Sequence, residues 1–219
     1  PADTFSETHR VPVVNAGGTV TATDIEITNA GQAISTSGPV KIRSSHIHHI
    51  VSRGSGAVQS GSRIELQDTV ISASSGRYAG ALHSNGVLLR NATLRDVDTG
   101  SSGGGIDTEN GARIINSTIE NVSARDNGGA IASKGNVVVR NSTIVDAHSE
   151  QDSSLYAYGA RLTLANVTLK NAGTVSFGKG GVTSGSITVQ DSRLIETNKL
   201  HAATIDIQHT TVNKSLSLY

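Results

Sequence analysis

A few polar side chains in this sequence have the types and spacing that sugar chemistry uses. Asp107 and Glu109 are separated by one residue, so in an extended strand both point to the same side, about 7 Å apart. That separation is compatible with a pair of carboxylates that act as acid and base. His83 and Lys134 occupy comparable positions near glycines, and Lys134 would have to act as the base. Polar residues are expected on any exposed strand, and this is the interpretation that we favour.

Two histidines separated by one residue, His46 and His48, could bind a metal ion. On a strand both imidazoles project outward around the inward Ile47, and such a pair can chelate zinc or copper. Glu26, one repeat earlier, could supply a third ligand. The sequence offers no convincing fourth ligand, so we expect surface histidines here and no metal or other cofactor.

Basic residues recur at corresponding places in successive repeats. The whole chain has 18 Lys and Arg against 18 Asp and Glu, so a basic stripe on a neutral protein predicts an anionic partner such as an acidic polysaccharide. Basic residues that merely keep a strand solvated are the alternative. Leu88, Ile115 and Val138 share this face. Unless a loop or a partner covers them, we expect them to be exposed and available, like the ends of the fold, for self-association. The stripe consists of Lys41, Arg43, Arg63, Arg90, Arg113, Arg140 and Arg161.

The composition excludes several classes of function. The balanced charge gives no reason to expect a nucleic-acid partner. No apolar run approaches the roughly 18 residues of a membrane span, so we expect no membrane insertion of this segment. Cysteine is absent, which excludes disulfides and thiolate metal sites. The chain begins at Pro1 and contains no methionine, so we expect it to be part of a longer protein.

A repeated apolar triad indicates the elements that hold these residues. In the copy formed by Val137, Val139 and Ile144, two apolar residues flank one position and the third follows five residues later. Nine copies occur, and from Val87 to Ile187 each begins 25 residues after the last. A fixed period of this length predicts a solenoid, and the period of two within each copy predicts strands.

A polar residue stands two positions after the second apolar residue of each triad, where it predicts a corner. Asn and Asp tolerate left-handed backbone, and their stacked amides can form a hydrogen-bonded ladder. Four of the six N-x-S/T sequons begin in this column, so we expect those asparagines to be structural. In this register the side chain of Ser142 points outward. The column consists of Asp24, Ser44, Asp68, Asn91, Asn116, Asn141, Asn166, Asp191 and His209.

A third strand precedes each triad, and a glycine then turns the chain into the next strand. Three short strands per coil, wound with the hand that strand twist imposes, predict an all-β fold: a single right-handed parallel β-helix of about nine coils. We expect residues 1–12 to form an N-terminal cap or extension, residues 13–213 the coils, and residues 214–219 the C-terminal end. The inward apolar residues of the third strand are Ile34, Val58, Leu82, Ile106, Ile131, Leu155 and Val182.

The repeat resembles those of known bacterial surface proteins. The segments GGGI (103–106) and GGAI (128–131), followed by RIINSTI and VVVRNSTI, are similar to repeats of polymorphic outer-membrane proteins and other autotransporter passengers. The coil plan with its asparagine corner also resembles the pectate-lyase-like superfamily. The first resemblance implies a secreted or surface-exposed virulence protein that acts as an adhesin. The second implies a polysaccharide lyase or hydrolase whose catalytic groups lie on the glycine-flanked strand, where His83, Asp107, Glu109 and Lys134 stand.

We favour a non-catalytic module that binds a host protein or an acidic polysaccharide. An enzyme needs a cleft, which long loops beside the glycine-flanked strand would build. The longest loops that we expect there are short, at about residues 147–154 and 172–181. A carbohydrate-active enzyme remains the alternative.

Overall fold

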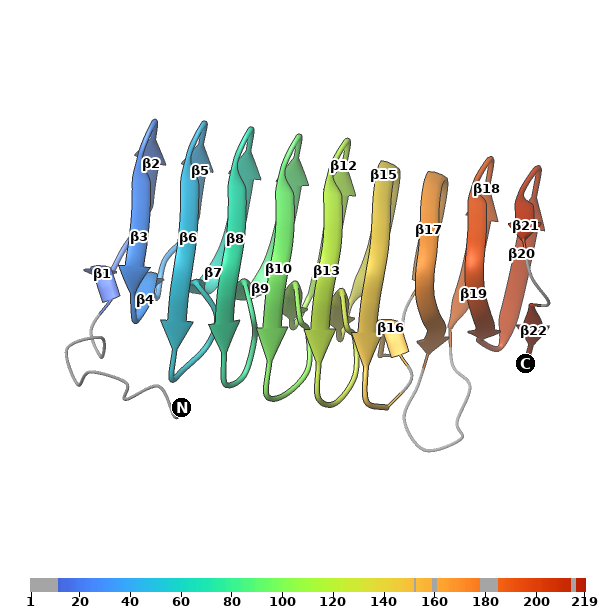
Figure 1. The fold of residues 1–219 in the computed structure, drawn as a ribbon. Coiled ribbons are helices and arrows are strands. Elements are labelled where there is room, and N and C mark those ends of the chain that lie inside the picture. Colours follow the sequence, from blue (N-terminus) through green and yellow to red (C-terminus); the bar gives the residue numbers. More distant parts are fainter. Residues whose placement is uncertain (1–11, 152, 159–160, 178–184, 214–215) are drawn as a thin grey trace.

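The computed structural model describes residues 12–151, 153–158, 161–177, 185–213 and 216–219. Within these ranges the chain forms 22 strands and no helix, and the strands pair in parallel. Successive turns stack side by side along one axis, so that β1 (Pro12–Ala16) and β22 (Ser217–Leu218) lie at opposite ends (Figure 1). The predicted right-handed parallel β-helix is confirmed.

Each turn contributes to three faces, which we call A, B and C. Face A consists of β2 (Val20–Thr23), β5 (Val40–Arg43), β12 (Gly111–Ile115), β18 (Ser186–Gln190) and β20 (Thr204–Gln208), with the later parts of β7 (Val58–Gln67) and β9 (Leu82–Arg90) and the first parts of β15 (Asn136–Ser149) and β17 (Arg161–Phe177).

Face B follows face A around the first corner of each turn. It consists of β3 (Glu26–Ala30), β6 (His46–Ser52), β8 (Val70–Gly76), β10 (Thr93–Thr99), β13 (Thr118–Ala124) and β21 (Thr211–Asn213), with further parts of β15 and β17 and the first part of β19 (Arg193–His201).

Face C contains the glycine-flanked segments. It consists of β1, β4 (Gln32–Thr36), β11 (Ile106–Thr108), β14 (Ile131–Ser133), β16 (Ser153–Ala157) and β22, with the first parts of β7 and β9 and the ends of β17 and β19.

The number of complete turns is slightly lower than the number of triads. Pairing along face A joins nine segments, one per triad, but the first and last have a neighbour on one side only. The seven segments between them are flanked on both sides, which gives about seven complete turns against about nine expected. The 25-residue step is preserved in space, because Val87, Ala112, Val137, Leu162 and Ile187 are successive partners.

The core is the row of inward apolar side chains that runs through the turns. Ile114, Val139 and Ile144 have no exposed surface, as the triad predicts, because each is covered by the same position in the turns on both sides. The predicted inward residues of the third strand are also buried, except Val182, which lies outside the described residues. The last turn is less protected, and Val212 is 39% exposed.

The first corner lies where the polar column predicts it. All nine residues of that column adopt left-handed backbone, with φ between 46° and 54°. The amide ladder forms in part: Asn166 Nδ2 donates to Asn141 Oδ1 at 3.1 Å, and Asn141 Nδ2 donates to Asn116 Oδ1 at 3.2 Å. Asparagine at these sequon positions is therefore explained by the corner.

A second corner, which the sequence analysis missed, bends face B five residues after the first. Its residues have φ between 47° and 54°. Here Asn121 Nδ2 donates to Asp96 Oδ1, and Asn171 Nδ2 donates to Asp146 Oδ1, both at 2.7 Å. The column consists of Asn29, His49, Ala73, Asp96, Asn121, Asp146, Asn171 and Glu196, and this mixture of types hides the pattern.

The expected outward orientation of Ser142 is wrong. Its side chain is buried, and its Oγ donates to the carbonyl of Arg140 at 2.6 Å and accepts the backbone N–H of Ser117 at 3.1 Å. The corner residue Asn141 interrupts the alternation of the strand, so the next residue points inward instead of outward.

The two expected loops are largely strand. Residues 147–149 belong to β15, residues 153–157 to β16, and residues 172–177 to β17. These segments continue the ladders of faces B and C, since Ala147 pairs with Val122 and Ser176 with Tyr156. Residues 178–181 of the second expected loop lie outside the described part of the chain.

Candidate functional site

Five residues of the basic stripe lie on face A in two parallel rows, and Arg63 and Arg161 stand where the chain enters this face. One row contains Arg43, Arg90 and Arg140, which alternate with Gln67 and Ile115 in successive turns. Strands stack about 4.8 Å apart, so neighbouring arginines of this row are roughly 10 Å apart along the axis.

Lys41 and Arg113 stand in the other row, where they alternate with Glu65, Leu88 and Val138. Arg113 is therefore offset by two residues from the row of Arg90 and Arg140. The stripe is a staggered array and not a single column.

Most basic side chains of the stripe are available to a ligand. Arg63 Nε lies 3.3 Å from Glu65 Oε1, and both side chains are partly exposed. For the six other basic residues, no ion pair forms with any residue that the structure describes. All six side chains are exposed. The charges are thus not neutralised by the described parts of the protein.

A hollow of about 350 Å³ opens in the part of face A nearest the N-terminal turns. It is lined by Lys41, Arg43, Arg63, Glu65 and Leu88, with Gln67 and Arg90 beside them. The prediction that Leu88 is exposed is wrong: only 7% of its surface is accessible. Its neighbours in register, Glu65 and Arg113, have long side chains whose stems can cover it.

Ile115 and Val138 are only half-buried. Large exposed apolar side chains stand instead at the last turn, where Val212, Leu218 and Tyr219 are 39%, 54% and 63% exposed.

Face C brings the candidate catalytic residues together in two separate ion pairs. His83 Nδ1 lies 3.1 Å from Asp107 Oδ2, and Lys134 Nζ lies 2.7 Å from Glu109 Oε2. The hydrogen bonds that Lys134 Nζ donates to the Glu109 carboxylate raise the pKa of Lys134 most, and the negative charge of Glu109 raises it further. A raised pKa means that Lys134 holds its proton more firmly than a free lysine, which is unfavourable for the role of base that the sequence suggested.

A second hollow, of about 420 Å³, adjoins these residues. Asp107 and Lys134 line it together with Tyr156, Tyr158 and Asn127. The two tyrosine rings lie 6.4 Å apart at 53°, and burial, followed by the proximity of Tyr158, raises the pKa of Tyr156. Although we expected only short loops on this face, a hollow forms there, and half of its lining residues lie outside the strands: Ser102, Asn127, Lys134 and Tyr158.

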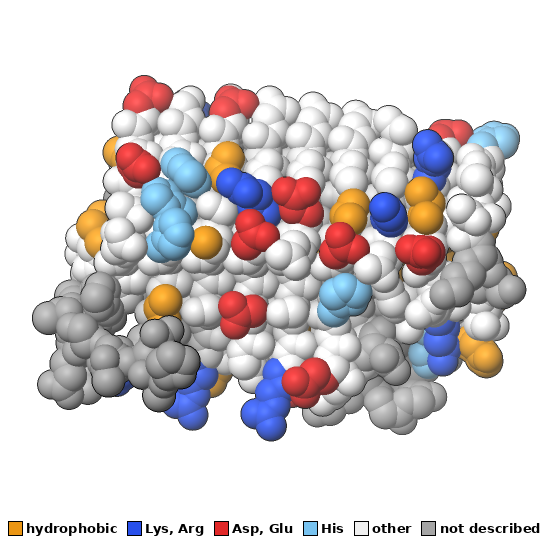
Figure 2. All heavy atoms as spheres, in the orientation of Figure 1, with side chains coloured by type: hydrophobic (Ala, Val, Ile, Leu, Met, Phe, Trp, Pro, Cys, Tyr) orange, Lys and Arg blue, Asp and Glu red, His pale blue; other side chains and the backbone are white. Residues whose placement is uncertain are grey.

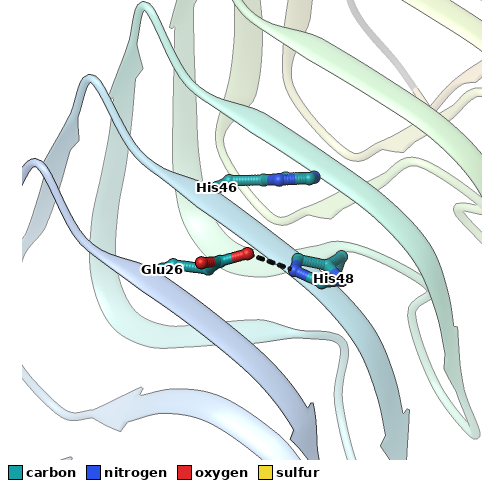
Figure 3. A group of neighbouring side chains, drawn as sticks. All are labelled: Glu26, His46 and His48. Atoms are coloured by element: carbon teal, nitrogen blue, oxygen red, sulfur yellow. Dashed lines mark hydrogen bonds and ion pairs between the residues drawn. The ribbon is translucent and has the colours of Figure 1, made fainter.

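A group of histidine side chains lies on face B near the first turns, as the space-filling view onto this face shows (Figure 2). His48 Nε2 lies 2.9 Å from Glu26 Oε1, and the rings of His46 and His48 stack with centroids 4.3 Å apart (Figure 3). One ligand atom from each of Glu26, His46 and His48 lies within 4.8 Å of the other two. Burial lowers the pKa of His46, and the neighbouring His48 lowers it further.

Three further residues, which the sequence analysis missed, contact these imidazoles. Nδ1 of His48 lies 3.2 Å from Oγ1 of Thr28 and 2.6 Å from Nδ1 of His49. Nε2 of His46 lies 3.1 Å from Oγ of Ser72. Thr28, His48 and Ser72 are register partners in β3, β6 and β8, so their proximity follows from a pairing that one strand alone does not reveal.

Comparison with known proteins does not assign this chain to a family. No family model, no curated protein and no solved structure matches this chain. No helix in the described residues is long and apolar enough to cross a membrane. The fold confirms the β-helix part of the resemblance, and no match supports membership of the autotransporter passengers or of the pectate-lyase-like superfamily.

Proposed function

We propose that this chain is a non-catalytic module that binds an acidic polysaccharide through face A, as part of a protein secreted or displayed by a bacterium. The observation that carries the proposal is the staggered array of six basic side chains without an ion-pair partner in the described structure. If the basic residues served only to keep the strands of face A solvated, they would not need to recur in such an array. The resemblance to autotransporter passengers supports a location at which such polymers are met.

The chemistry of the array suits an extended anionic chain. A guanidinium can donate two parallel hydrogen bonds to one carboxylate or sulfate group. Arginines roughly 10 Å apart match the length of about two sugar units of an extended polysaccharide, so each can meet an acidic group in successive disaccharide units. Arg113 and Lys41, in the second row, can contact groups on the other edge of the same polymer. The hollow beside Leu88 offers room for a sugar ring.

Each contact is weak, because an exposed charge pair is screened by salt. We therefore expect micromolar or weaker affinity for heparin and polygalacturonate per module, and a marked decrease as salt increases. Affinity should rise when several modules are immobilised together, since one polymer can then engage several arrays.

The experiment compares two triple variants that remove the same charge. In the first, Arg43, Arg90 and Arg140 are replaced by Ser; binding to immobilised heparin and to polygalacturonate should fall at least tenfold while the melting temperature changes little. In the matched control Arg53, Arg77 and Arg125, which are exposed and lie outside face A, are replaced by Ser, and binding should be retained. Equal loss in both variants would mean nonspecific charge attraction, and retention in both would refute the site.

The carbohydrate-active enzyme has support from one observation, the hollow on face C beside the His83–Asp107 pair. The same polysaccharides serve as its test. Formation of shortened or unsaturated products by the parent chain, abolished by Asp107→Asn, would establish the enzyme and contradict the non-catalytic proposal. We expect no products, because Lys134 and Glu109 are occupied with each other.

A further inference from the structure

The strongest feature outside faces A and C is the cluster of Glu26, His46 and His48 on face B. We propose that it binds one divalent transition-metal ion of the zinc type, and that the ion fastens the first turn of the β-helix to the second. Glu26 comes from β3 in the first turn, whereas both histidines come from β6 in the second. The site is distinct from the polysaccharide face and does not depend on it.

The donor set and its geometry fit such an ion. Two imidazoles and one carboxylate form a set of ligands known from zinc sites that keep a fourth position for water. Bond lengths of about 2.0–2.2 Å around a tetrahedral ion place neighbouring ligand atoms roughly 3.3 Å apart. Nε2 of His48 and Oε1 of Glu26 are already 2.9 Å apart, and all three ligand atoms lie within 4.8 Å of one another. Small side-chain rotations therefore suffice to enclose the ion.

Hydrogen bonds already orient the rings for binding. Nδ1 of His48 is engaged by Thr28 and His49, which leaves Nε2 directed at Glu26. Ser72 contacts the ring of His46 from the third turn. A metal-binding histidine usually has its second nitrogen hydrogen-bonded, which fixes the ring and its tautomer. His49 is held beside His48 by the left-handed backbone of the second corner, with φ of 54°.

The position of the cluster gives the ion a structural role. Glu26 and His46 are register partners, so one ion bound to both links two turns across their hydrogen-bonded edge. Within the described residues, β3 pairs only with β6, so the first turn has a neighbour on one side. Ile27 in that turn remains 7% exposed, whereas Ile47 in the second turn is fully buried. A terminal repeat opens more readily than an internal one, and an added link there slows the opening.

Calorimetric titration of the chelator-treated protein with zinc chloride tests the binding. The parent should take up one zinc ion per chain with micromolar or higher affinity. Glu26→Gln and His48→Gln should each weaken binding at least tenfold, because each removes one of three ligands. His83→Gln is the matched control: His83 also contacts a carboxylate, at 3.1 Å, but stands on face C, so its loss should leave zinc affinity unchanged. Circular dichroism confirms that each variant is folded.

Amide hydrogen exchange with and without zinc tests the link between the turns. Exchange in β2 and β3 should slow at least severalfold on zinc addition in the parent, and should not respond in His48→Gln. Equal zinc affinity of the parent and both cluster variants would overturn the site and leave the histidines as a stacked surface pair. Specific binding without slower exchange in β2 and β3 would overturn the structural role.

Discussion

Within the described residues, every turn but the last bends at two single residues that hold a left-handed backbone. At the first corner the residue types indicate this conformation, since most of them are Asn or Asp, which tolerate a left-handed backbone. At the second corner His49, Ala73 and Glu196 hold the same conformation, although it is unfavourable for ordinary side chains. The neighbouring turns impose it there, through strand pairing on both sides of the bend. In several turns a buried hydroxyl follows the first corner and caps backbone groups, as the hydroxyls of Ser45, Ser117 and Ser142 do.

The hydroxyl of Ser142 gives a test at this scale. Ser142→Ala should lower the free energy of unfolding by about 1–2 kcal/mol, because the buried N–H of Ser117 loses its acceptor. Ser123→Ala is the control: Ser123 lies on β13 with an exposed side chain, and its replacement should change stability by less than about 0.5 kcal/mol. Urea unfolding measures both, and equal effects would contradict the inward orientation of Ser142.

Strands of successive turns approach each other closely between faces B and C, and glycine makes this possible. A Cβ atom on Gly104 would lie 2.1 Å from the carbonyl oxygen of Gly129 and 2.5 Å from that of Ser123. Gly129 in turn would place a Cβ 2.2 Å from the carbonyl oxygen of His148. Each is the second glycine of one of the two motifs that suggested the family resemblance, so their repetition reflects backbone packing between turns. The motif therefore specifies the fold and not an activity.

The close approach of the backbone at Gly104 predicts that adding one methyl group at this position lowers the stability of the fold considerably. Gly104→Ala should destabilise the protein by about 1–3 kcal/mol, because only backbone atoms surround the added carbon and the turns must separate. Gly86→Ala provides the comparison, since a Cβ there meets nothing closer than 3.9 Å. Thermal unfolding should show a clear decrease in melting temperature for the first variant and little change for the second. A neutral Gly104→Ala would mean that the turns are packed less tightly than described.

The whole molecule is an array in which each turn contacts only its neighbours. Its stability should then be close to a sum of contributions from turns and from the interfaces between them. The array also separates its surface chemistry by face, with basic residues on A, an ion-paired hollow on C and the histidines on B. Because the faces share one core but few side chains, a change on one face should leave the others intact.

Deletion of a complete turn tests this independence. Removal of residues 118–142, 25 residues, joins Ser117 to Thr143, which is the register partner of Thr118. The shortened protein should remain folded, with β-rich circular dichroism, cooperative unfolding and a moderately lower melting temperature. Removal of residues 118–141 shifts the following strands by one residue, which exchanges their inward and outward sides at the junction. That variant should be markedly less stable, and similar stability of the two would contradict the stacking register.

The 25-residue period, the inward triads and the first corner could be predicted from sequence alone. Val87, Ala112 and Val137 occupy the same position in consecutive turns and so face the same environment, which leaves a repeated pattern of residue types. The grouping of His46, His48 and Glu26 could also be predicted, because the short spacing and the repeat together fix which outward residues are neighbours.

Only the tertiary structure determined the directions of side chains at the corners and the side-chain contacts between turns. The left-handed corner residue Asn141 interrupts the alternation of inward and outward side chains along the strand. Ser142 therefore points inward, although strict alternation would place it outward. The separation of Asp107 and Glu109 into two ion pairs depends on side-chain conformations between neighbouring turns. His49 joins His48 because the second corner bends the strand there. Such contacts depend on the register between neighbouring turns and on which residues adopt a left-handed backbone. The residue types of a single turn do not determine either of these.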